Sequence, residues 1–228
     1  MGVENMGKLG MITIGQAPRT DVAPIIERCL EGRAELVQGG ALDGLDKADI
    51  ERELFPEEGQ YVLTSRLATG ESVVMSREKL QPLLQKRISE FEEAGIRHIL
   101  LLCTGVFPGL RAERSYLIEP DHLIPPAVKA MAGGRRLGVL VPLQEQCATL
   151  AQKYEPYGLS PVFAVASPYK RDEAEFRRAA EELKEKSDII VLDCMGYTEE
   201  ARQFMAEASG KPVVLSNALM GKLVSEMI

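Results

Sequence analysis

Short apolar runs alternate with amphipathic segments along the whole chain. The apolar runs predict buried strands over residues 8–15, 97–103, 136–144, 160–169, 188–194 and 211–216. The segments between them carry apolar residues every three or four positions and predict helices over residues 20–32, 78–94, 145–158, 171–187, 198–210 and 217–227. Strands that alternate with helices are typical of parallel sheets with right-handed crossovers, so we expect an α/β fold.

Two segments depart from this alternation. Residues 60–78 hold two β-rich runs around a turn at residues 68–71, which is typical of a hairpin. Residues 120–136 contain three prolines and two glycines. We therefore expect a crossover into a second structural unit there, with only a short helix near residues 127–131.

A weak internal repeat connects the two halves of the chain. The segment "KLGMITIGQ" at residues 8–16 resembles "RLGVLVPLQ" at residues 136–144. Each copy then leads through a helix to an apolar strand that ends in a cysteine, with a glycine two residues later, in "HILLLCTG" and "DIIVLDCMG". The first half carries an insertion at residues 41–78. Because the cysteine and the glycine match as well as the hydrophobicity, the pattern indicates two similar halves.

The chemistry that stands out is this pair of strand-end thiols, Cys103 and Cys194. In open parallel sheets, ligands bind beyond the carboxyl ends of the strands. We expect a helix to begin after each cysteine, so that its N-terminal N–H groups stabilise a thiolate. Lowering a thiol pKa from about 8.5 to about 6.5 requires about 2.7 kcal/mol from such dipoles. Two thiols on opposite sides of one carbon can remove a proton on one face and return it on the other. Cys29 and Cys147 are expected to face the core.

Composition and charge narrow the classes of function. The 228 residues have a net charge of −7, which leaves no basic excess for nucleic-acid phosphates. No apolar run has the length of about 20 residues that a membrane helix needs, and the first residues lack a secretory signal. Widely spaced cysteines without a C-x-x-C pair indicate reduced thiols in the cytoplasm. Two histidines without ligand spacing predict no metal site, and we expect no cofactor.

A family resemblance sharpens this interpretation. The motifs that carry it are "TIGQAPRTD", "IEPDHLIPP", "VPLQEQ", "SPVF", "DCMGY" and "PVVLSNAL". They resemble the AroM family, within the Asp/Glu/hydantoin racemase superfamily, over nearly the whole chain. The resemblance implies two pseudo-symmetric lobes, each a mostly parallel sheet flanked by helices, with the active cleft between them. We place residues 1–120 and 213–228 in the N-terminal lobe and residues 121–212 in the C-terminal lobe. A homodimer is also implied.

The resemblance further implies which residues contact substrate. Cys103 and Cys194 would be catalytic, and the substrate-binding residues would be Gly15, Gln16, Arg19, Thr104, Gly105, Gly196, Tyr197, Ser216 and Asn217. Arg19 can grip a carboxylate or stay solvated, Thr104 can donate to substrate or cap a helix, and Asn217 can cap the last helix. Asp193 is expected to point away from the neighbouring thiol, because side chains alternate along a strand.

The sequence departs from the superfamily after the second cysteine. Many amino-acid racemases of the superfamily have Thr-His there, whereas this chain has Met195, Gly196 and Tyr197. We expect a cofactor-independent racemase, isomerase or lyase that acts on a small carboxylate by cysteine chemistry. Two alternatives stay open: a small-molecule-binding or regulatory protein without turnover, and a thiol redox switch between Cys103 and Cys194.

Overall fold

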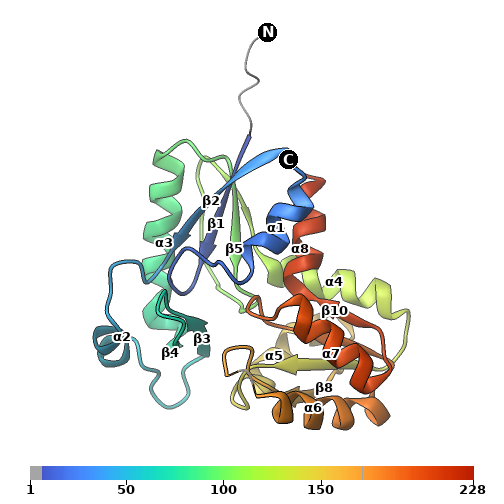
Figure 1. Ribbon diagram of the computed structural model, residues 1–228. Coiled ribbons are helices and arrows are strands. Elements are labelled where there is room, and N and C mark those ends of the chain that lie inside the picture. The colour runs from blue at the N-terminus through green and yellow to red at the C-terminus, as the bar shows by residue number, and fades with distance from the viewer. Residues whose placement is uncertain (1–6, 171) are drawn as a thin grey trace.

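Two four-stranded parallel sheets form the framework of the protein (Figure 1). The computed structural model describes residues 7–170 and 172–228. The elements of the first half, in chain order, are β1 (Gly7–Thr13), α1 (Ala23–Leu30), β2 (Ala34–Gly40), α2 (Lys47–Glu53), β3 (Val62–Arg66), β4 (Ser72–Ser76), α3 (Arg77–Glu93), β5 (His98–Leu102) and β6 (Tyr116–Ile118). Those of the second half are α4 (Pro120–Ala132), β7 (Leu137–Val141), α5 (Gln146–Tyr154), the 3₁₀ turn η1 (Glu155–Tyr157), β8 (Val162–Val165), α6 (Glu173–Lys186), β9 (Ile189–Leu192), α7 (Glu199–Ser209), β10 (Val213–Leu215) and α8 (Ser216–Ser225).

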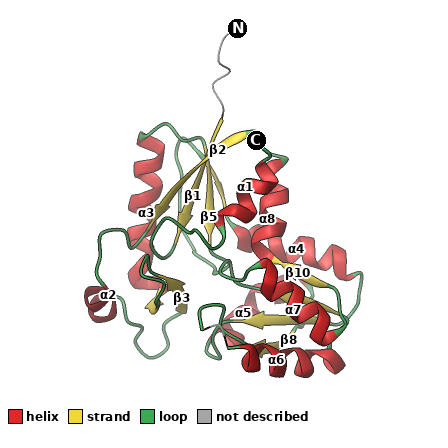
Figure 2. Ribbon diagram, in the orientation of Figure 1, coloured by secondary structure: helices red, strands yellow, loops and turns green. Residues whose placement is uncertain are grey.

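The two sheets share one topology, which agrees with the internal repeat. Their strand orders are β2-β1-β5-β6 and β8-β7-β9-β10, and every strand is parallel to its neighbour. Helices cover the faces of each sheet (Figure 2). The predicted α/β fold with two similar lobes is therefore confirmed. The strands β5 and β9, which the cysteines follow, occupy the same third place in their sheets.

The insertion in the first lobe contains a helix and a hairpin. Strands β3 and β4 pair antiparallel, as predicted, with Leu63 opposite Met75. Both side chains are buried in a core cluster shared with β5 and α3. Burial of these side chains holds the hairpin against the first sheet, beside the carboxyl end of β5. The helix α2 and the strands β2 and β6 were not predicted.

The helices that end the two lobes are exchanged between them. The helix α4 follows the last strand of the first sheet and packs against α5 and η1 of the second lobe. The helix α8 follows the last strand of the second sheet and packs against α1 of the first lobe. One hydrophobic cluster accordingly contains residues of both sheets, such as Met11 and Val139, together with Met220 of α8. The lobes thus share a continuous core.

Two predicted boundaries need correction. The proline-rich segment forms the long helix α4, because Pro120 occupies its first turn and apolar residues such as Ile124 and Val128 face the core. We placed residues 213–228 in the first lobe, but β10 pairs with β9 of the second sheet. The chain therefore returns to the first lobe at α8.

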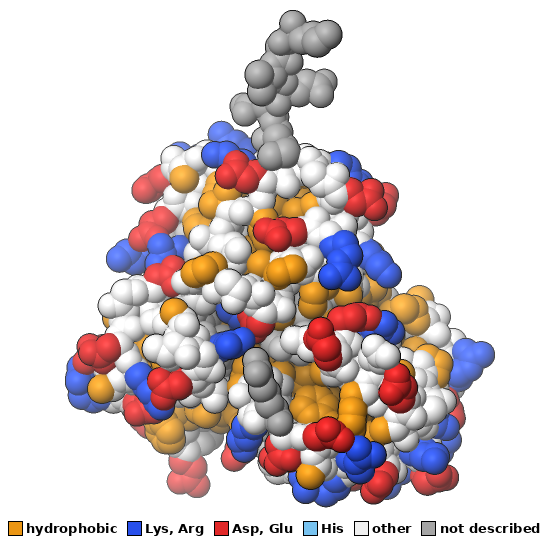
Figure 3. Space-filling model, in the orientation of Figure 1, with side chains coloured by type: hydrophobic (Ala, Val, Ile, Leu, Met, Phe, Trp, Pro, Cys, Tyr) orange, Lys and Arg blue, Asp and Glu red, His pale blue; other side chains and the backbone are white. Residues whose placement is uncertain are grey.

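The surface carries both signs of charge. On the face shown in Figure 3, basic and acidic side chains are interspersed over both lobes. Among the helices that the structure describes, none is both long enough and apolar enough to cross a membrane. The prediction that no secretory signal begins the chain concerns a segment that includes residues 1–6, which lie outside the described part.

Candidate active site

Two similar turns carry the strand-end cysteines. The backbone N–H of Gly105 donates to Cys103 Sγ at 3.3 Å, and that of Gly196 donates to Cys194 Sγ at 3.4 Å. A helix follows only one of them: α7 begins after Cys194, whereas the chain after Cys103 runs irregularly to β6. The predicted helix after Cys103 is therefore wrong. Each thiol instead meets an N–H two residues ahead in its own turn.

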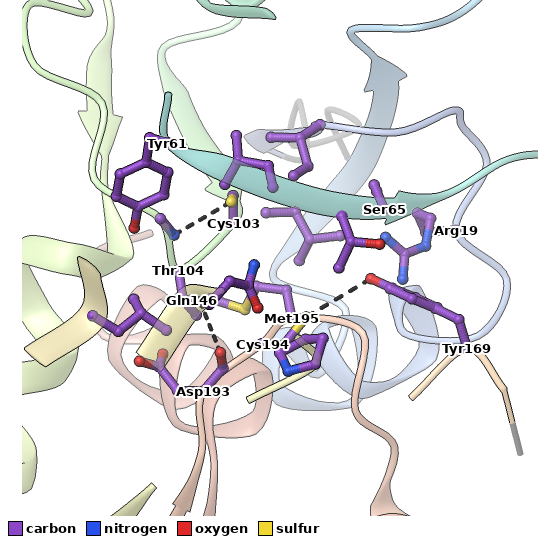
Figure 4. A pocket seen from close by; sticks show the side chains of 17 residues that line it. Arg19, Tyr61, Ser65, Cys103, Thr104, Gln146, Tyr169, Asp193, Cys194 and Met195 are labelled. Atoms are coloured by element: carbon purple, nitrogen blue, oxygen red, sulfur yellow. Dashed lines mark hydrogen bonds between the residues drawn. The ribbon is translucent and has the colours of Figure 1, made fainter. Parts of the chain in front are cut away.

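Both thiols line one small hollow between the lobes, as the sequence predicted. Figure 4 shows them on opposite sides of it. Its volume is about 30 Å³, room for one or two water molecules. The side chains and backbone around it come from both lobes and from the hairpin: Ile14, Arg19, Tyr61, Leu63, Thr64, Ser65, Leu102, Cys103, Thr104, Gly105, Pro142, Gln146, Leu150, Tyr169, Asp193, Cys194 and Met195. Cys29 and Cys147 are half-buried outside it.

Arg19 is buried at this hollow and not solvated. Its side chain is only 3% exposed, and its Nε and Nη2 atoms each donate to the Asp21 carboxylate at 2.9 Å. Burial lowers the pKa of Arg19, but Tyr169 and Asp21 outweigh that effect and keep the group charged. Arg19 in turn holds the pKa of Asp21 below its usual range against the effect of burial. The remaining nitrogen, Nη1, donates to Thr13 Oγ1 at 3.3 Å and retains a second N–H.

Burial raises the pKa of both thiols, contrary to the predicted depression. The Cys103 thiol, 7% exposed, has its pKa raised to about 12 by burial, although the Gly105 N–H and the Lys153 charge act to lower it. Burial also raises the pKa of Cys194, against the Gly196 N–H, the Tyr169 hydroxyl and the Arg19 charge. Tyr169 Oη lies 3.7 Å from Cys194 Sγ. In this closed arrangement both groups are neutral thiols at pH 7.

Three residues that were predicted to bind substrate instead support the Cys194 turn from outside the hollow. Asn217, inside α8, donates from Nδ2 to the carbonyls of Met195 at 3.1 Å and Tyr197 at 2.7 Å. It therefore does not cap that helix. Tyr197 donates to Ala166 O at 2.7 Å, and Ser216 donates to Leu192 O at 2.7 Å. All three are buried outside the hollow, so their observed contacts fix the turn.

The glycines that were predicted to bind substrate mostly allow neighbouring side chains to lie close to the backbone. A Cβ on Gly196 would lie 2.4 Å from Tyr169 Oη, and one on Gly15 would lie 2.4 Å from Ser65 Oγ. Neither glycine lines the hollow, whereas Gly105 does. Gln16 donates to Leu42 O and Leu45 O and accepts from Ala68 N–H. Gln16 therefore ties the loop after β1 to the insertion, outside the hollow.

Three polar atoms at the hollow have no hydrogen-bond partner among the residues that the structure describes. They are Tyr61 Oη, Ser65 Oγ and Gln146 Oε1, and all are buried. An unpaired buried polar atom costs about 1–3 kcal/mol and needs an explanation such as a bound ligand. Tyr61 and Ser65 belong to the hairpin region and Gln146 begins α5, so the sequence offered no local signal for them. Tyr169 was also missed.

A buried ion pair lies beside the hollow. Lys153 Nζ meets the Asp193 carboxylate oxygens at 2.8 and 2.7 Å, and the two side chains are 1% and 0% exposed. Thr104 donates from Oγ1 to the Asp193 carbonyl at 3.1 Å. The Thr104 hydroxyl therefore bonds across the lobes and caps no helix. Within the described residues, no group of three or more His, Cys, Asp or Glu side chains is placed to hold a metal ion.

Comparison with known proteins agrees with this architecture. The profile of the AroM protein family matches residues 9–228, so the chain belongs to that family. No curated protein matches the sequence.

The fold is also that of several solved structures. Aspartate racemase from Picrophilus torridus superposes with a TM-score of 0.63 at 13% identity, over 96% of this chain and 95% of that one. Glutamate racemase from Aquifex pyrophilus gives 0.61 at 16% identity, over 97% and 84%. Maleate isomerase from Pseudomonas putida S16 gives 0.61 at 12% identity, over 97% and 92%. At these identities the likeness shows the fold alone.

Proposed function

We propose that this AroM-family protein is a cofactor-independent enzyme of the racemase or isomerase type. It would move a proton at a carbon next to a carboxylate, with Cys194 and Cys103 as base and acid. The observation that carries the proposal is that two thiols, from equivalent turns of two equivalent lobes, line one hollow. The named activities of the racemases and the isomerase with this fold agree with it.

The proposed reaction exchanges a proton between the two sulfurs. The Cys194 thiolate takes the proton from the carbon, and the C–H electron pair passes into the carboxylate as an enediolate. The Cys103 thiol then donates its proton to the opposite face of that carbon and becomes the thiolate. The carbon is inverted, no redox change occurs, and the two thiols have swapped protonation states.

We assign the first step to Cys194 because its surroundings favour a thiolate more than those of Cys103. The Tyr169 hydroxyl and the Arg19 charge both act to lower the pKa of Cys194. Cys103 lies in an apolar cluster with Leu63 and Phe107, and burial raises its pKa to about 12. A thiol with that pKa stays protonated at neutral pH, so Cys103 holds the proton that must be returned.

The proposed ligand is a small carboxylate that also carries a hydrogen-bond donor. The free N–H of Arg19 Nη1, Ser65 Oγ and Tyr61 Oη can donate to carboxylate oxygens. Gln146 Oε1 can only accept. Its orientation is fixed because Nε2 donates to Val62 O at 3.3 Å. A hydroxyl or amino group beside the carboxylate would satisfy this acceptor.

Substrate entry requires the site to open, because about 30 Å³ does not accommodate a carboxylic acid. The wall of the hollow includes hairpin residues Leu63 and Ser65 and second-lobe residues Gln146 and Tyr169. Separation of these walls would admit a ligand and water. Hydration of the opened site would also lower the pKa of both thiols, because burial is the main cause of their rise.

A second candidate is a small-carboxylate-binding or regulatory protein without turnover. It is favoured by the raised pKa of both thiols and by Met195, Gly196 and Tyr197 where many related racemases have Thr-His. The cytoplasmic location, the homodimer and the absence of a cofactor stay predictions.

Solvent deuterium exchange separates the two candidates. The protein would be incubated in D₂O with aspartate, malate, lactate and alanine, each as both enantiomers, and mass spectrometry would follow deuterium at the carbon next to the carboxylate. We expect exchange with inversion of that carbon for at least one acid, and a loss of about 100-fold or more of the inversion in Cys194→Ser and in Cys103→Ser. Cys29→Ser, outside the hollow, is the matched control and should exchange like the native protein. Unchanged exchange in both site variants would reject the enzyme.

A further inference from the structure

We propose that Lys153 is a positioning residue that, with Asp193 and Thr104, sets the separation of the two cysteine thiols. We call these three residues the inter-turn clamp. The clamp deepens the proposed function, because thiols that serve one carbon must be held at a fixed distance. Its geometric claim can be tested whether or not the protein has turnover.

The clamp joins the peptide units next to each thiol. Lys153 Nζ donates to the Thr104 carbonyl at 3.0 Å and to both carboxylate oxygens of Asp193. Thr104 follows Cys103 directly, and Asp193 directly precedes Cys194. The three N–H groups of the ammonium thus all go to the two turns.

A second connection runs in parallel with the first. Thr104 Oγ1 donates to the Asp193 carbonyl at 3.1 Å, so the first turn also bonds directly to the backbone of the second (Figure 4). Since β5 and β9 belong to different sheets, no ladder of strand hydrogen bonds fixes these turns relative to each other. The clamp supplies polar contacts that do so.

Stability alone does not account for a pair of charges at this position. Burying an ammonium and a carboxylate costs desolvation energy that the pair barely recovers, and apolar replacements of similar volume are often as stable. In some proteins such pairs fix one geometry, because every alternative leaves a buried charge unpaired, and the clamp assigns that role to this pair. A fixed geometry is what two-sided proton transfer needs, since a misplacement of about 1 Å costs roughly 100-fold in rate.

The charges of the clamp also act on the thiols in opposite senses. Lys153 lowers the pKa of Cys103, and Asp193 raises that of Cys194. The clamp charges therefore oppose the lowering of the Cys194 pKa by Arg19 and Tyr169. A balance of this kind suits two thiols that must exchange protonation states in every turnover.

The test measures how easily a short reagent bridges the two thiols. Methylene bis(methanethiosulfonate) would be added to the native protein, and peptide mass spectrometry would give the yield of the intramolecular Cys103–Cys194 bridge. The test variant is Lys153→Met/Asp193→Leu, which removes both charges without leaving one unpaired. The control is Tyr154→Phe, which removes a 3.1 Å hydrogen bond to Asp193 within the second lobe only.

We expect the bridge yield to fall about fivefold or more in the double variant and to stay within twofold of native in the control. A folded double variant with a native bridge yield overturns the proposal. If the double variant does not fold, Thr104→Val replaces it, because that change removes only the bond between the turns. A drop beyond the twofold range of the control is then expected in Thr104→Val, and a yield within that range overturns the clamp.

The deuterium exchange assay keeps this proposal apart from the proposed function. Wherever the native protein exchanges deuterium, the double variant should lose roughly 100-fold in rate. A native protein that exchanges nothing, but whose bridge yield depends on the clamp, rejects the enzyme and retains the clamp. If the native protein exchanges deuterium, and the double variant keeps the native bridge yield and exchange rate, the enzyme is retained and the clamp is rejected.

Discussion

The two cysteine turns share a backbone design and differ in their surroundings. Each follows the third strand of its sheet, and each thiol receives an N–H from a glycine two residues later. The Cys194 turn leads into a helix and is braced by Asn217. The Cys103 turn leads into an irregular segment and packs on the hairpin residue Leu63. The repeated backbone supplies two equivalent thiols, and non-equivalent neighbours give them different chemistry.

Under the proposed function, this difference assigns the first proton transfer to the second-lobe thiol. The second-lobe thiol meets polar partners, Tyr169 and Arg19, whereas the first-lobe thiol meets mainly apolar side chains and the Lys153 charge. An enzyme that starts its reaction from one side needs such a difference, because two identical thiols would lose their protons equally.

Breaking the link with a single substitution should have the largest effect. Lys153→Met leaves the fully buried Asp193 carboxylate without its cation, which should cost about 3–5 kcal/mol in the free energy of unfolding. Chemical denaturation measures this loss. Lys153→Met/Asp193→Leu is the matched control and should recover most of it. A single variant as stable as the native protein would mean that the pair is not buried as described.

High pH should destabilise the protein through the buried thiols. The folded pKa of Cys103 is raised to about 12, so the stability that the neutral thiol contributes is complete below about pH 9 and is lost as pH rises from there toward 12. The slope for one such thiol reaches about 1.4 kcal/mol per pH unit midway between the two pKa values, which gives roughly 2 kcal/mol between pH 9 and 11. Denaturation at both pH values would show a smaller decline in Cys103→Ala. An equal decline in the native protein and in Cys103→Ala would mean that the Cys103 thiol is exposed to solvent in the folded state.

Adding one methyl group to each turn tests which of the two turns is packed more tightly. Gly196→Ala places a Cβ within 2.4–2.7 Å of the Tyr169 ring, and we expect about 1–3 kcal/mol of destabilisation. Gly105→Ala brings its Cβ to 2.9 Å from the end of the Leu63 side chain, which can move aside, so its cost should be below about 1 kcal/mol. Thermal melting of the two variants tests the order. The reverse order would contradict the tighter packing that we assign to the Cys194 turn.

Removing a single hydroxyl should have the smallest effect. Tyr169→Phe deletes the group that acts to lower the pKa of Cys194, so its pKa should rise and its alkylation by iodoacetamide at pH 8 should slow about threefold to tenfold. Cys103 provides the internal control, because burial, the Gly105 N–H and the Lys153 charge act on its pKa and the Tyr169 hydroxyl does not. Equal slowing of both thiols would point to a general closure of the hollow instead.

The sequence predicted the features that produce a local pattern of apolar residues or glycines. The apolar runs marked the strands that carry the thiols, and the matching glycines marked both turns. Strand β2, with the sequence AELVQGG, and the three-residue β6 are short or mixed in polarity, so their patterns were too weak to predict them. The long helix α4 was missed because its prolines mimic a loop.

The supporting contacts of the site depend on long-range pairing, which periodicity does not reveal. Asp193 was considered as an isolated charge, but its partner Lys153 lies 40 residues earlier on α5. Asn217 was interpreted as a ligand contact or a helix cap, but its amide binds the turn 20 residues earlier. Tyr61, Ser65 and Gln146 meet only after the hairpin and the second lobe have folded together.

The central claim is that Cys103 and Cys194 share one carboxylate site. Ligand protection of the four cysteines tests this claim. The protein would be alkylated with iodoacetamide at pH 8, with and without millimolar aspartate, malate, lactate or alanine, and each cysteine would be quantified by mass spectrometry. We expect at least one acid to slow the alkylation of Cys103 and Cys194 together and to leave that of Cys29 and Cys147 unchanged. Protection of Cys29 or Cys147 without Cys103 and Cys194, or protection of just one of the two hollow thiols, would contradict a shared carboxylate site.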